Sequence, residues 1–268
     1  MHLSAISIYP VKSGAGLSLA EARVEARGLR HDRRFMVVDP QLRFITARQE
    51  PRLMLLRALP AEGWLDLHAP GMEPMRVLAP EGNADRMPVR VWGDEVDAAA
   101  CDAAAEAWLS RFLGREVRLA YMDGYARRGV DPHYGRADDT VSFADGFPLL
   151  AISQAALDDL NARLAAPLPM NRFRPNLVIA GSEPHAEDGW RRVRIGAVEF
   201  DFVKPCTRCV ATTVDHESGT FDPSGEPLNT LKTYRRGSSG ITFGQNLLPR
   251  GAGTVRVGDD VEVLEHLL

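Results

Sequence analysis

The sequence predicts a mainly β protein with a few helices. Short runs of β-branched and aromatic residues recur along the 268 positions, and Gly, Pro and Asp separate them. Only two segments show the apolar spacing of an amphipathic helix. The composition, 45% hydrophobic and 25% charged, is that of an ordinary globular chain, which is long enough for one large domain or two joined ones.

The first 122 residues are expected to be almost entirely β. Their predicted strands are Leu3–Ile8, Arg34–Asp39, Phe44–Ala47, Met54–Leu59, Trp64–His68, Met75–Leu78, Val89–Asp97 and Val117–Tyr121. One helix interrupts them at Ala103–Leu113, where an apolar stripe repeats at i, i+3, i+4 and i+7 from Ala105. This stripe should face the core.

A polar segment from Asp123 to Thr140 separates the two halves of the chain. It contains several glycines and shows no periodicity, which is typical of a linker or a functional loop. We therefore expect a first domain at residues 1–122 and a second at residues 123–268.

The second domain is predicted to contain a helix that begins after Ser153, a residue suited to an N-cap. Its predicted strands are Asn176–Ala180, Arg192–Ile195, Val198–Val203, Val210–Val214, Thr254–Val257 and Asp260–Leu264. Two dipeptides, Gly196-Ala197 and Gly258-Asp259, are predicted to be hairpin turns.

Several function classes find no support in the sequence. Three cysteines do not make a disulfide framework, and neither a signal peptide nor a run of about 18 apolar residues is found. We therefore expect a cytoplasmic protein that does not bind membranes. A net charge of −4 also argues against a nucleic-acid partner.

Cys206-Thr207-Arg208-Cys209 holds two of the three cysteines and admits several interpretations. A redox dithiol would need a strand-helix-strand context that the sequence lacks. A zinc site would need two more ligands, of which His216 is the nearest candidate. The cysteines could also be buried apolar residues. The fourth interpretation is one metal-ligating thiolate, which the neighbouring cations Lys204 and Arg208 would favour.

Basic residues stand at the ends of several predicted strands. Lys12 and Ser13 follow the first strand, Arg33 precedes the next, and similar cations occur at Arg48 and Arg174. Any one of these could be a solvated surface charge. Clustered around a thiolate, they would instead hold a multiply charged organic ligand.

At this point the sequence resembles a known family, the molybdenum enzymes with a MOSC domain preceded by a MOSC N-terminal β-barrel domain. Bacterial N-hydroxylated-base reductases and the mitochondrial amidoxime-reducing component belong to it. The resemblance covers nearly the whole chain and rests on short motifs in the same order: Tyr9-Pro10-Val11-Lys12-Ser13, Gly28-Leu29 with Asp32-Arg33, Phe44–Gln49, Ser142–Gly146, Phe173–Asn176, Lys204–Cys209 with Thr212-Thr213-Val214, and Phe243–Asn246. It implies two β-barrel domains, the second of which binds the cofactor.

The resemblance also implies a molybdenum cofactor and its site. Cys209 matches the thiolate that ligates the metal and is the main catalytic residue. Asp145 is a candidate proton source for the reaction, and its alternative interpretation is a turn-forming residue. The positions that match cofactor contacts are Lys12, Ser13, Arg33, Gly146, Phe147, Arg174, Thr207, Arg208, Cys209 and Asn246. Cys206 is expected to be a packing residue and Cys101 a core residue. Four residues of the polar segment could line the substrate entrance or form a solvated loop face: Arg127, Arg128, His133 and Tyr134.

The activity implied by the resemblance is reduction of N-hydroxylated compounds, namely amidoximes, hydroxylamines or N-hydroxylated nucleobases, which suits detoxification. The chain ends at Leu268 without ligands for an iron–sulfur cluster, so we expect electrons from a separate ferredoxin-, flavodoxin- or cytochrome-type protein. The same pocket could instead serve a non-catalytic molybdenum-cofactor carrier or a sulfur carrier. Pyridoxal phosphate is not expected.

Overall fold

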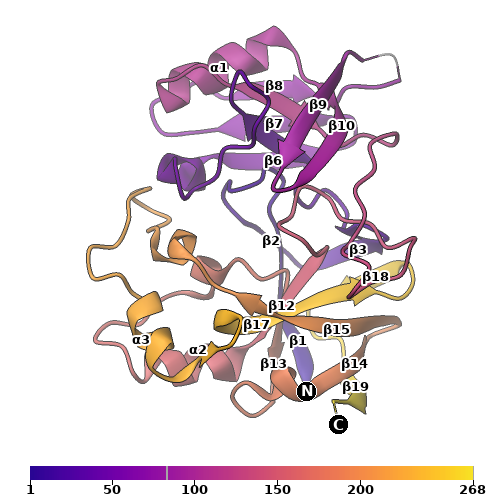
Figure 1. Ribbon diagram of the computed structural model, residues 1–268, viewed down its shortest axis with the longest axis vertical. Helices are drawn as coiled ribbons and strands as arrows, with labels where there is room; N and C mark the ends of the chain where they lie inside the picture. Colours follow the sequence, from indigo (N-terminus) through magenta and orange to yellow (C-terminus); the bar gives the residue numbers. More distant parts are fainter. Residues whose placement is uncertain (83, 268) are drawn as a thin grey trace.

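The computed structural model describes residues 1–82 and 84–267 and has two lobes, one above the other in Figure 1. Both chain ends lie in the lower lobe. Most of the regular structure is β-strand, so the predicted mainly β class with a few helices is confirmed.

The upper lobe contains two antiparallel sheets, with strand orders β5-β11-β10-β9 and β6-β7-β8. Their strands are Phe35–Val38 (β5), Arg57–Ala61 (β6), Trp64–His68 (β7), Met75–Leu78 (β8), Arg86–Val91 (β9), Asp94–Ala100 (β10) and Arg118–Tyr121 (β11). Strand β7 pairs on both sides, with Leu65 opposite Pro60 of β6 and Val77 of β8.

The lower lobe is built on a larger sheet with the order β19-β14-β15-β17-β12-β13-β1-β2, in which β16 also pairs with β17, and on a small sheet β18-β3-β4. The strands are His2–Ile8 (β1), Leu17–Leu19 (β2), Glu21–Glu25 (β3), Gly28–Leu29 (β4), Leu149–Ser153 (β12), Leu177–Ala180 (β13), Trp190–Ile195 (β14), Val198–Thr207 (β15), Arg236–Gly237 (β16), Gly240–Pro249 (β17), Gly253–Arg256 (β18) and Val261–His266 (β19). Since β1 pairs with β13, the first strand of the chain lies in the same sheet as its last third. The domain boundary near residue 122 stays a prediction.

In residues 1–82 and 84–267, three α-helices accompany the sheets. The predicted helix Ala103–Leu113 is α1; Asp102 caps its start by accepting from the backbone N–H of Ala105 at 2.7 Å. Helix α2 (Gln154–Asn161) begins after Ser153, whose Oγ accepts from the N–H of Ala156 at 3.2 Å, as predicted. Helix α3 (Leu228–Tyr234) was not predicted. Short 3₁₀ turns lie at Pro51–Leu55 (η1), Met170–Phe173 (η2), Ala186–Gly189 (η3) and Val210–Thr213 (η4).

Several predicted strands are wrong in detail. The segment predicted as the strand Val210–Val214 is largely the turn η4, because the hydroxyls of Thr212 and Thr213 donate to carbonyls three residues earlier, at 2.9 and 2.8 Å. The predicted strand Val89–Asp97 is a hairpin of β9 and β10. In the segment predicted as the strand Phe44–Ala47, Phe44 makes one isolated bridge, to Val38. Gly258-Asp259 joins β18 and β19, which pair in different sheets rather than with each other.

Each lobe has its own apolar core. In the upper lobe, the apolar stripe of α1 is buried: Trp108, Leu109 and Phe112 pack in one cluster with residues of β5, β7 and β11. Cys101 is buried in the same cluster, as predicted, and burial raises the pKa of its thiol. The lower core is formed mainly by β1, β14, β15 and their neighbours.

Candidate functional site

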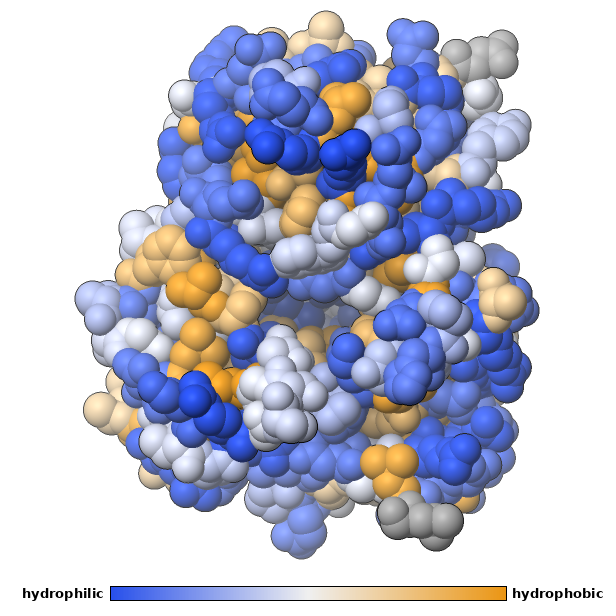
Figure 2. Space-filling view, viewed as in Figure 1, coloured by the Kyte–Doolittle hydropathy of each residue, from blue (hydrophilic) through white to orange (hydrophobic). Residues whose placement is uncertain are grey.

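A cavity of about 160 Å³ lies between the lobes and has residues of both in its wall. Figure 2 shows the surface hollowed between the upper and lower lobes. Thr46 and Arg48 reach the cavity from the segment after β5, and Cys209 reaches it from the end of β15. The cavity is therefore shaped by segments far apart in the chain.

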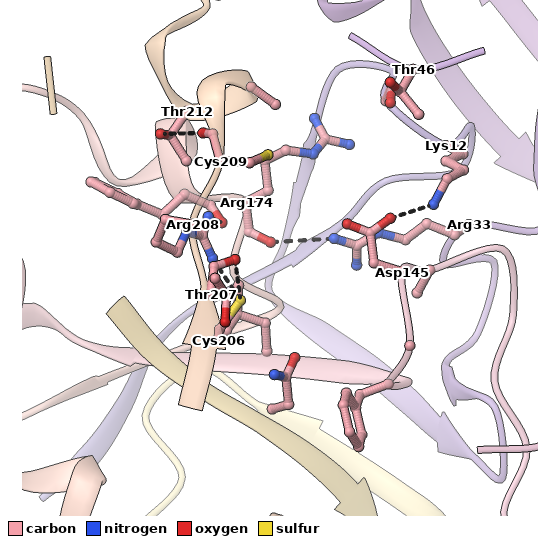
Figure 3. A pocket seen from close by; sticks show the side chains of 18 of the residues that line it. Lys12, Arg33, Thr46, Asp145, Arg174, Cys206, Thr207, Arg208, Cys209 and Thr212 are labelled. Carbon is pink, nitrogen blue, oxygen red and sulfur yellow. Dashed lines mark hydrogen bonds and ion pairs between the residues drawn. The ribbon is translucent and has the colours of Figure 1, made fainter. Parts of the chain in front are cut away.

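The structure brings all the predicted site residues to this one cavity. Its wall includes Lys12, Ser13, Arg33, Asp145, Gly146, Phe147, Arg174, Thr207, Arg208, Cys209 and Asn246. Figure 3 shows several of them around a common space. Their individual roles remain predictions.

Three of these residues have an unusual backbone. Ser13, Arg33 and Arg174 have φ values of 64°, 48° and 57°, in the left-handed region that non-glycine residues seldom adopt. Such a conformation costs about 1 kcal/mol or more at each position. Strain of this kind is common at functional sites, but His31, Leu42, Trp92 and His185, which do not line the cavity, have the same backbone conformation.

Tyr9 organises two of the cations and was not predicted to do so. Its buried ring lies between the guanidinium groups of Arg33 and Arg174, at 4.2 and 4.1 Å from the ring centroid. Its hydroxyl donates to the carbonyl of Pro175 at 3.0 Å. Burial raises the pKa of Tyr9 to about 12, so the ring stays neutral at physiological pH. A buried aromatic residue in the motif that carries Lys12 was the only sequence signal for this arrangement.

Arg33 is also held by hydrogen bonds that sequence reasoning missed. It donates to the buried carboxylate of Asp32 at 2.5 Å and to Oδ1 of Asn176 at 2.9 Å. The amide of Asn176 in turn donates to the carbonyl of Ser7 at 3.1 Å. These contacts fix the Arg33 side chain between β1 and β13.

Arg174 forms no ion pair with any residue that the structure describes. Its Nη1 donates to the carbonyl of Gly14 at 2.6 Å, while its Nη2 is buried and makes no hydrogen bond with any described residue. Burial lowers the pKa of Arg174 to about 10, and the charge of Arg33 acts in the same direction. Within the described chain, Nε of Arg208 is likewise buried without a partner. These unsatisfied cationic groups fit an anionic ligand in the cavity.

The two cysteines of the Cys-x-x-Cys motif have different partners. Sγ of Cys209 accepts a hydrogen bond from Nε of Arg48 at 3.1 Å, and Sγ of Cys206 accepts one from Nη1 of Arg208 at 2.9 Å. Cys206 also packs against the apolar cluster under η2 and β17. Residues 1–82 and 84–267 contain no group of three or more His, Cys, Asp or Glu residues arranged to hold a metal. The geometry therefore gives the zinc interpretation no support.

Asp145 is paired with Lys12 at the edge of the cavity (Figure 3). Nζ of Lys12 donates to Oδ1 of Asp145 at 2.6 Å and to the carbonyl of Phe143 at 2.7 Å. Nε1 of Trp92, in the turn between β9 and β10, donates to the same carboxylate at 3.3 Å. Desolvation acts to raise the pKa of Asp145, but the charges of Lys12 and Arg48 outweigh it, so this pKa lies well below its ordinary range. Asp145 is therefore ionised at neutral pH.

The polar segment at residues 123–140 is a fixed loop, and it lies beside the cavity rather than in its wall. Arg128 is buried and fixes the backbone of the segment that leads to Gly146 in the cavity wall. Its guanidinium donates to the carbonyls of Ser142 and Asp145 at 3.1 and 2.8 Å. The ring of Tyr134 packs edge-on against Phe147, which does line the cavity, at a centroid distance of 5.6 Å. None of the four residues proposed for a substrate entrance is a wall residue of this cavity: Arg127, Arg128, His133 and Tyr134.

Comparison with known proteins agrees with the predicted resemblance. Residues 1–116 match the family described as the MOSC N-terminal beta barrel domain, and residues 138–262 match the MOSC domain. The chain is 38% identical to mouse mitochondrial amidoxime-reducing component 1, over 96% of this chain and 80% of that protein. It is 37% identical to the human component 1, over 96% and 81%, and 36% identical to rat mitochondrial amidoxime reducing component 2, over 97% and 82%.

Among solved structures, the YUAD protein from Bacillus subtilis covers 97% of this chain and 92% of its own, with 10% identity and a TM-score of 0.45. That similarity is too weak to support an argument.

The predicted cytoplasmic location is wrong by this comparison. The similar proteins from mouse, human and rat are all named as mitochondrial. The prediction rested on a missing signal peptide and a missing apolar run, and neither observation separates the cytoplasm from other reducing compartments. In the described part of the chain, no helix has the length and apolar character needed to cross a membrane.

Proposed function

Because this chain belongs to the family of MOSC-domain proteins that includes the mitochondrial amidoxime-reducing components, we propose that it is a molybdenum-cofactor-dependent reductase of N-hydroxylated compounds. The observation that carries the proposal is the set of unsatisfied cations around a half-buried thiol. Arg174 and Arg208 each have a buried nitrogen without a partner among the described residues, beside a cavity that also exposes Cys209. An anionic cofactor would bind the unpartnered cationic nitrogens, and a metal with affinity for thiolates would bind Cys209.

In this proposal, Sγ of Cys209 is the ligand to the metal. The cofactor's anionic groups are bound by Lys12, Arg33 and Arg174, with Ser13 and Asn246 as hydrogen-bond partners and the main chain at Gly146 close by. The fit rests on Arg174, because an anion beside its Nη2 would relieve the penalty that burial imposes on its charge. When bound, the cofactor supplies the two-electron couple for the reaction.

The protein positions the substrate and supplies protons. Reduction of an N-hydroxyl group consumes two electrons and two protons, breaks the N–O bond and releases water. Asp145 is ionised and has no proton to donate at neutral pH, so we assign it the role of holding Lys12. The ammonium group of Lys12 is the protonated member of this pair, and Lys12 is a wall residue of the cavity.

The electrons are proposed to come from a separate protein, of ferredoxin, flavodoxin or cytochrome type. The similar proteins are named as components of amidoxime reduction, which suits a chain that works with an electron-transfer partner. The N-hydroxylated substrate is proposed to be an amidoxime, a hydroxylamine or an N-hydroxylated nucleobase.

The test compares wild type with Cys209→Ser and Cys206→Ser, all produced in cells that make the molybdenum cofactor. Molybdenum and pterin contents are measured, and each protein is assayed for benzamidoxime reduction with a chemical electron donor. We expect Cys209→Ser to lose metal-dependent activity, and Cys206→Ser to retain most of it. Equal loss in both variants would contradict a single working thiolate and would favour a dithiol or zinc site.

Two other outcomes separate the alternatives. Wild type that contains molybdenum and pterin but fails to convert any N-hydroxylated compound would be a cofactor carrier and would refute the reductase. A persulfide on Cys209, detected by mass spectrometry, would indicate sulfur transfer. Protein without molybdenum would refute both the reductase and the cofactor carrier.

A further inference from the structure

Arg48 links the two lobes directly at the predicted metal ligand. It belongs to the segment after β5 in the upper lobe, and its Nε donates to Sγ of Cys209, at the end of β15 in the lower lobe, over 3.1 Å. The two residues are 161 positions apart in the sequence. Both line the cavity, so the hydrogen bond lies in the wall that would face a ligand.

The guanidinium of Arg48 is held in place by aromatic contacts. It lies 4.6 Å from the ring centroid of Trp92, which itself packs edge-on against Phe44 at 4.9 Å. The indole Nε1 of Trp92 donates to Asp145, which anchors the ring at the cavity edge. This cation–π contact restrains the guanidinium while its Nε donates to the sulfur.

The nearby carboxylate of Asp145 is paired with Lys12 and does not form an ion pair with Arg48. No ion pair joins it to a carboxylate of the described residues, whereas Arg33, Arg86, Arg128 and Arg250 all have one. Cys209 is therefore its principal hydrogen-bond acceptor. Cys206 has a different donor, Arg208, which comes from the same loop as the cysteine itself.

We propose that Arg48 is a positioning residue that orients the thiolate of Cys209 and raises the reduction potential of a metal bound to it. The inference rests on the proposed function. A charge-assisted N–H···S hydrogen bond withdraws electron density from a ligating sulfur, and the guanidinium adds a positive charge beside the centre. Both effects favour the reduced, more electron-rich state, and hydrogen bonds to sulfur and local charge are known to set the potentials of thiolate-bound metal centres. Trp92 supports this role by fixing the guanidinium.

The test is a redox titration of the cofactor-loaded protein, followed by the electron paramagnetic resonance signal of the metal. Arg48→Gln should keep its molybdenum, show a reduction potential shifted to more negative values, and turn over benzamidoxime about 10-fold or more slowly. Arg48→Lys retains the charge but lacks the Nε donor, so its potential should shift less. Trp92→Leu leaves Arg48 intact and should shift the potential in the same direction as Arg48→Gln.

The matched control is Arg76→Gln, because Arg76 stacks on Trp64 of the upper lobe at 4.7 Å in the same manner and is absent from the cavity wall. Its potential should equal that of wild type. An unchanged potential and spectrum in metal-loaded Arg48→Gln would overturn the inference, as would loss of metal from both folded Arg48 variants, which would make Arg48 a binding residue instead. If Arg48→Gln does not fold, Trp92→Leu decides by the same criterion.

The failure of this inference is distinguishable from failure of the proposed function. A wild-type protein that holds molybdenum and reduces no N-hydroxylated compound refutes the reductase, while a shifted potential in Arg48→Gln would still support the role of Arg48. Active protein with the same potential in every variant refutes only the role of Arg48.

Discussion

Replacing Tyr9 by leucine should destabilise the protein far more than removing its hydroxyl alone. The ring is buried between two guanidinium groups, at 4.2 Å from Arg33 and 4.1 Å from Arg174. A cation–π contact shielded from solvent contributes about 1–2 kcal/mol, so the pair contributes about 2–4 kcal/mol. The hydroxyl donates to the carbonyl of Pro175 at 3.0 Å, which adds about 1 kcal/mol.

These contributions give separate expectations for two variants. Tyr9→Phe keeps both cation–π contacts and should lower the free energy of unfolding by about 1 kcal/mol. Tyr9→Leu loses the contacts as well and should lower it by about 3–5 kcal/mol. For a chain of this length, each kcal/mol shifts Tm by about 2 °C, so the expected decreases are about 2 °C and about 6–10 °C.

The assay is thermal and urea unfolding of the metal-free protein, so that loss of cofactor does not contribute to the signal. Tyr125→Leu is the control, because its side chain is 72% exposed and its replacement should change stability by less than about 0.5 kcal/mol. Tyr9→Leu should also abolish any rise in Tm that added phosphate produces, because Arg33 and Arg174 would no longer be positioned by the aromatic ring. The reasoning is refuted if Tyr9→Leu and Tyr9→Phe are equally stable.

Two further predictions concern the pH dependence of stability. The pKa of Asp145 is lowered, so its ion pair with Lys12 stabilises the protein fully above the ordinary carboxyl pKa of about 4. This stabilisation is lost as the pH falls below that value. The urea midpoint of Asp145→Asn should therefore decrease less steeply in this pH range than the midpoint of wild type. For His216, burial and then the charges of Arg174 and Arg172 lower the pKa to about 4. The unfolded chain takes up this proton first, so stability should decrease by up to about 3 kcal/mol between about pH 6.5 and pH 4, and His216→Asn should remove that decrease. An unchanged slope in either variant would show that the group does not titrate as its environment indicates.

The elements that were predicted correctly are those whose pattern is local. The helix Ala103–Leu113 and the strands Trp64–His68 and Met75–Leu78 have the predicted bounds, because their apolar spacing matches one buried face of a regular element. The segment after Cys209 failed because β-branched threonines are typical of strands but also bond to nearby carbonyls. That competition is decided by the surrounding structure, which a sequence pattern does not contain.

The site could be predicted only as far as its motifs extend. Lys12, Arg174 and Cys209 stand in recognisable motifs, and the structure brings them to one cavity. The roles of Tyr9 and Trp92 were missed because each depends on a contact across the fold: two guanidiniums on one ring, and an indole beside a carboxylate. Such contacts have no periodic signature in the chain.

The cavity wall contains features that destabilise the folded state. Three residues of its wall, Ser13, Arg33 and Arg174, have strained left-handed backbones, and Arg174 keeps a buried charge without a carboxylate partner among the described residues. Four residues outside the cavity wall, His31, Leu42, Trp92 and His185, share the strained backbone, but other arginines, such as Arg128 and Arg250, are paired with carboxylates. Strain and unpaired charge that coincide in one cavity are expected where a ligand restores the balance. The buried, unpaired charge of Arg174 in the cavity wall is therefore the strongest physical reason to expect an anionic ligand there, and it predicts that such a ligand stabilises the fold on binding.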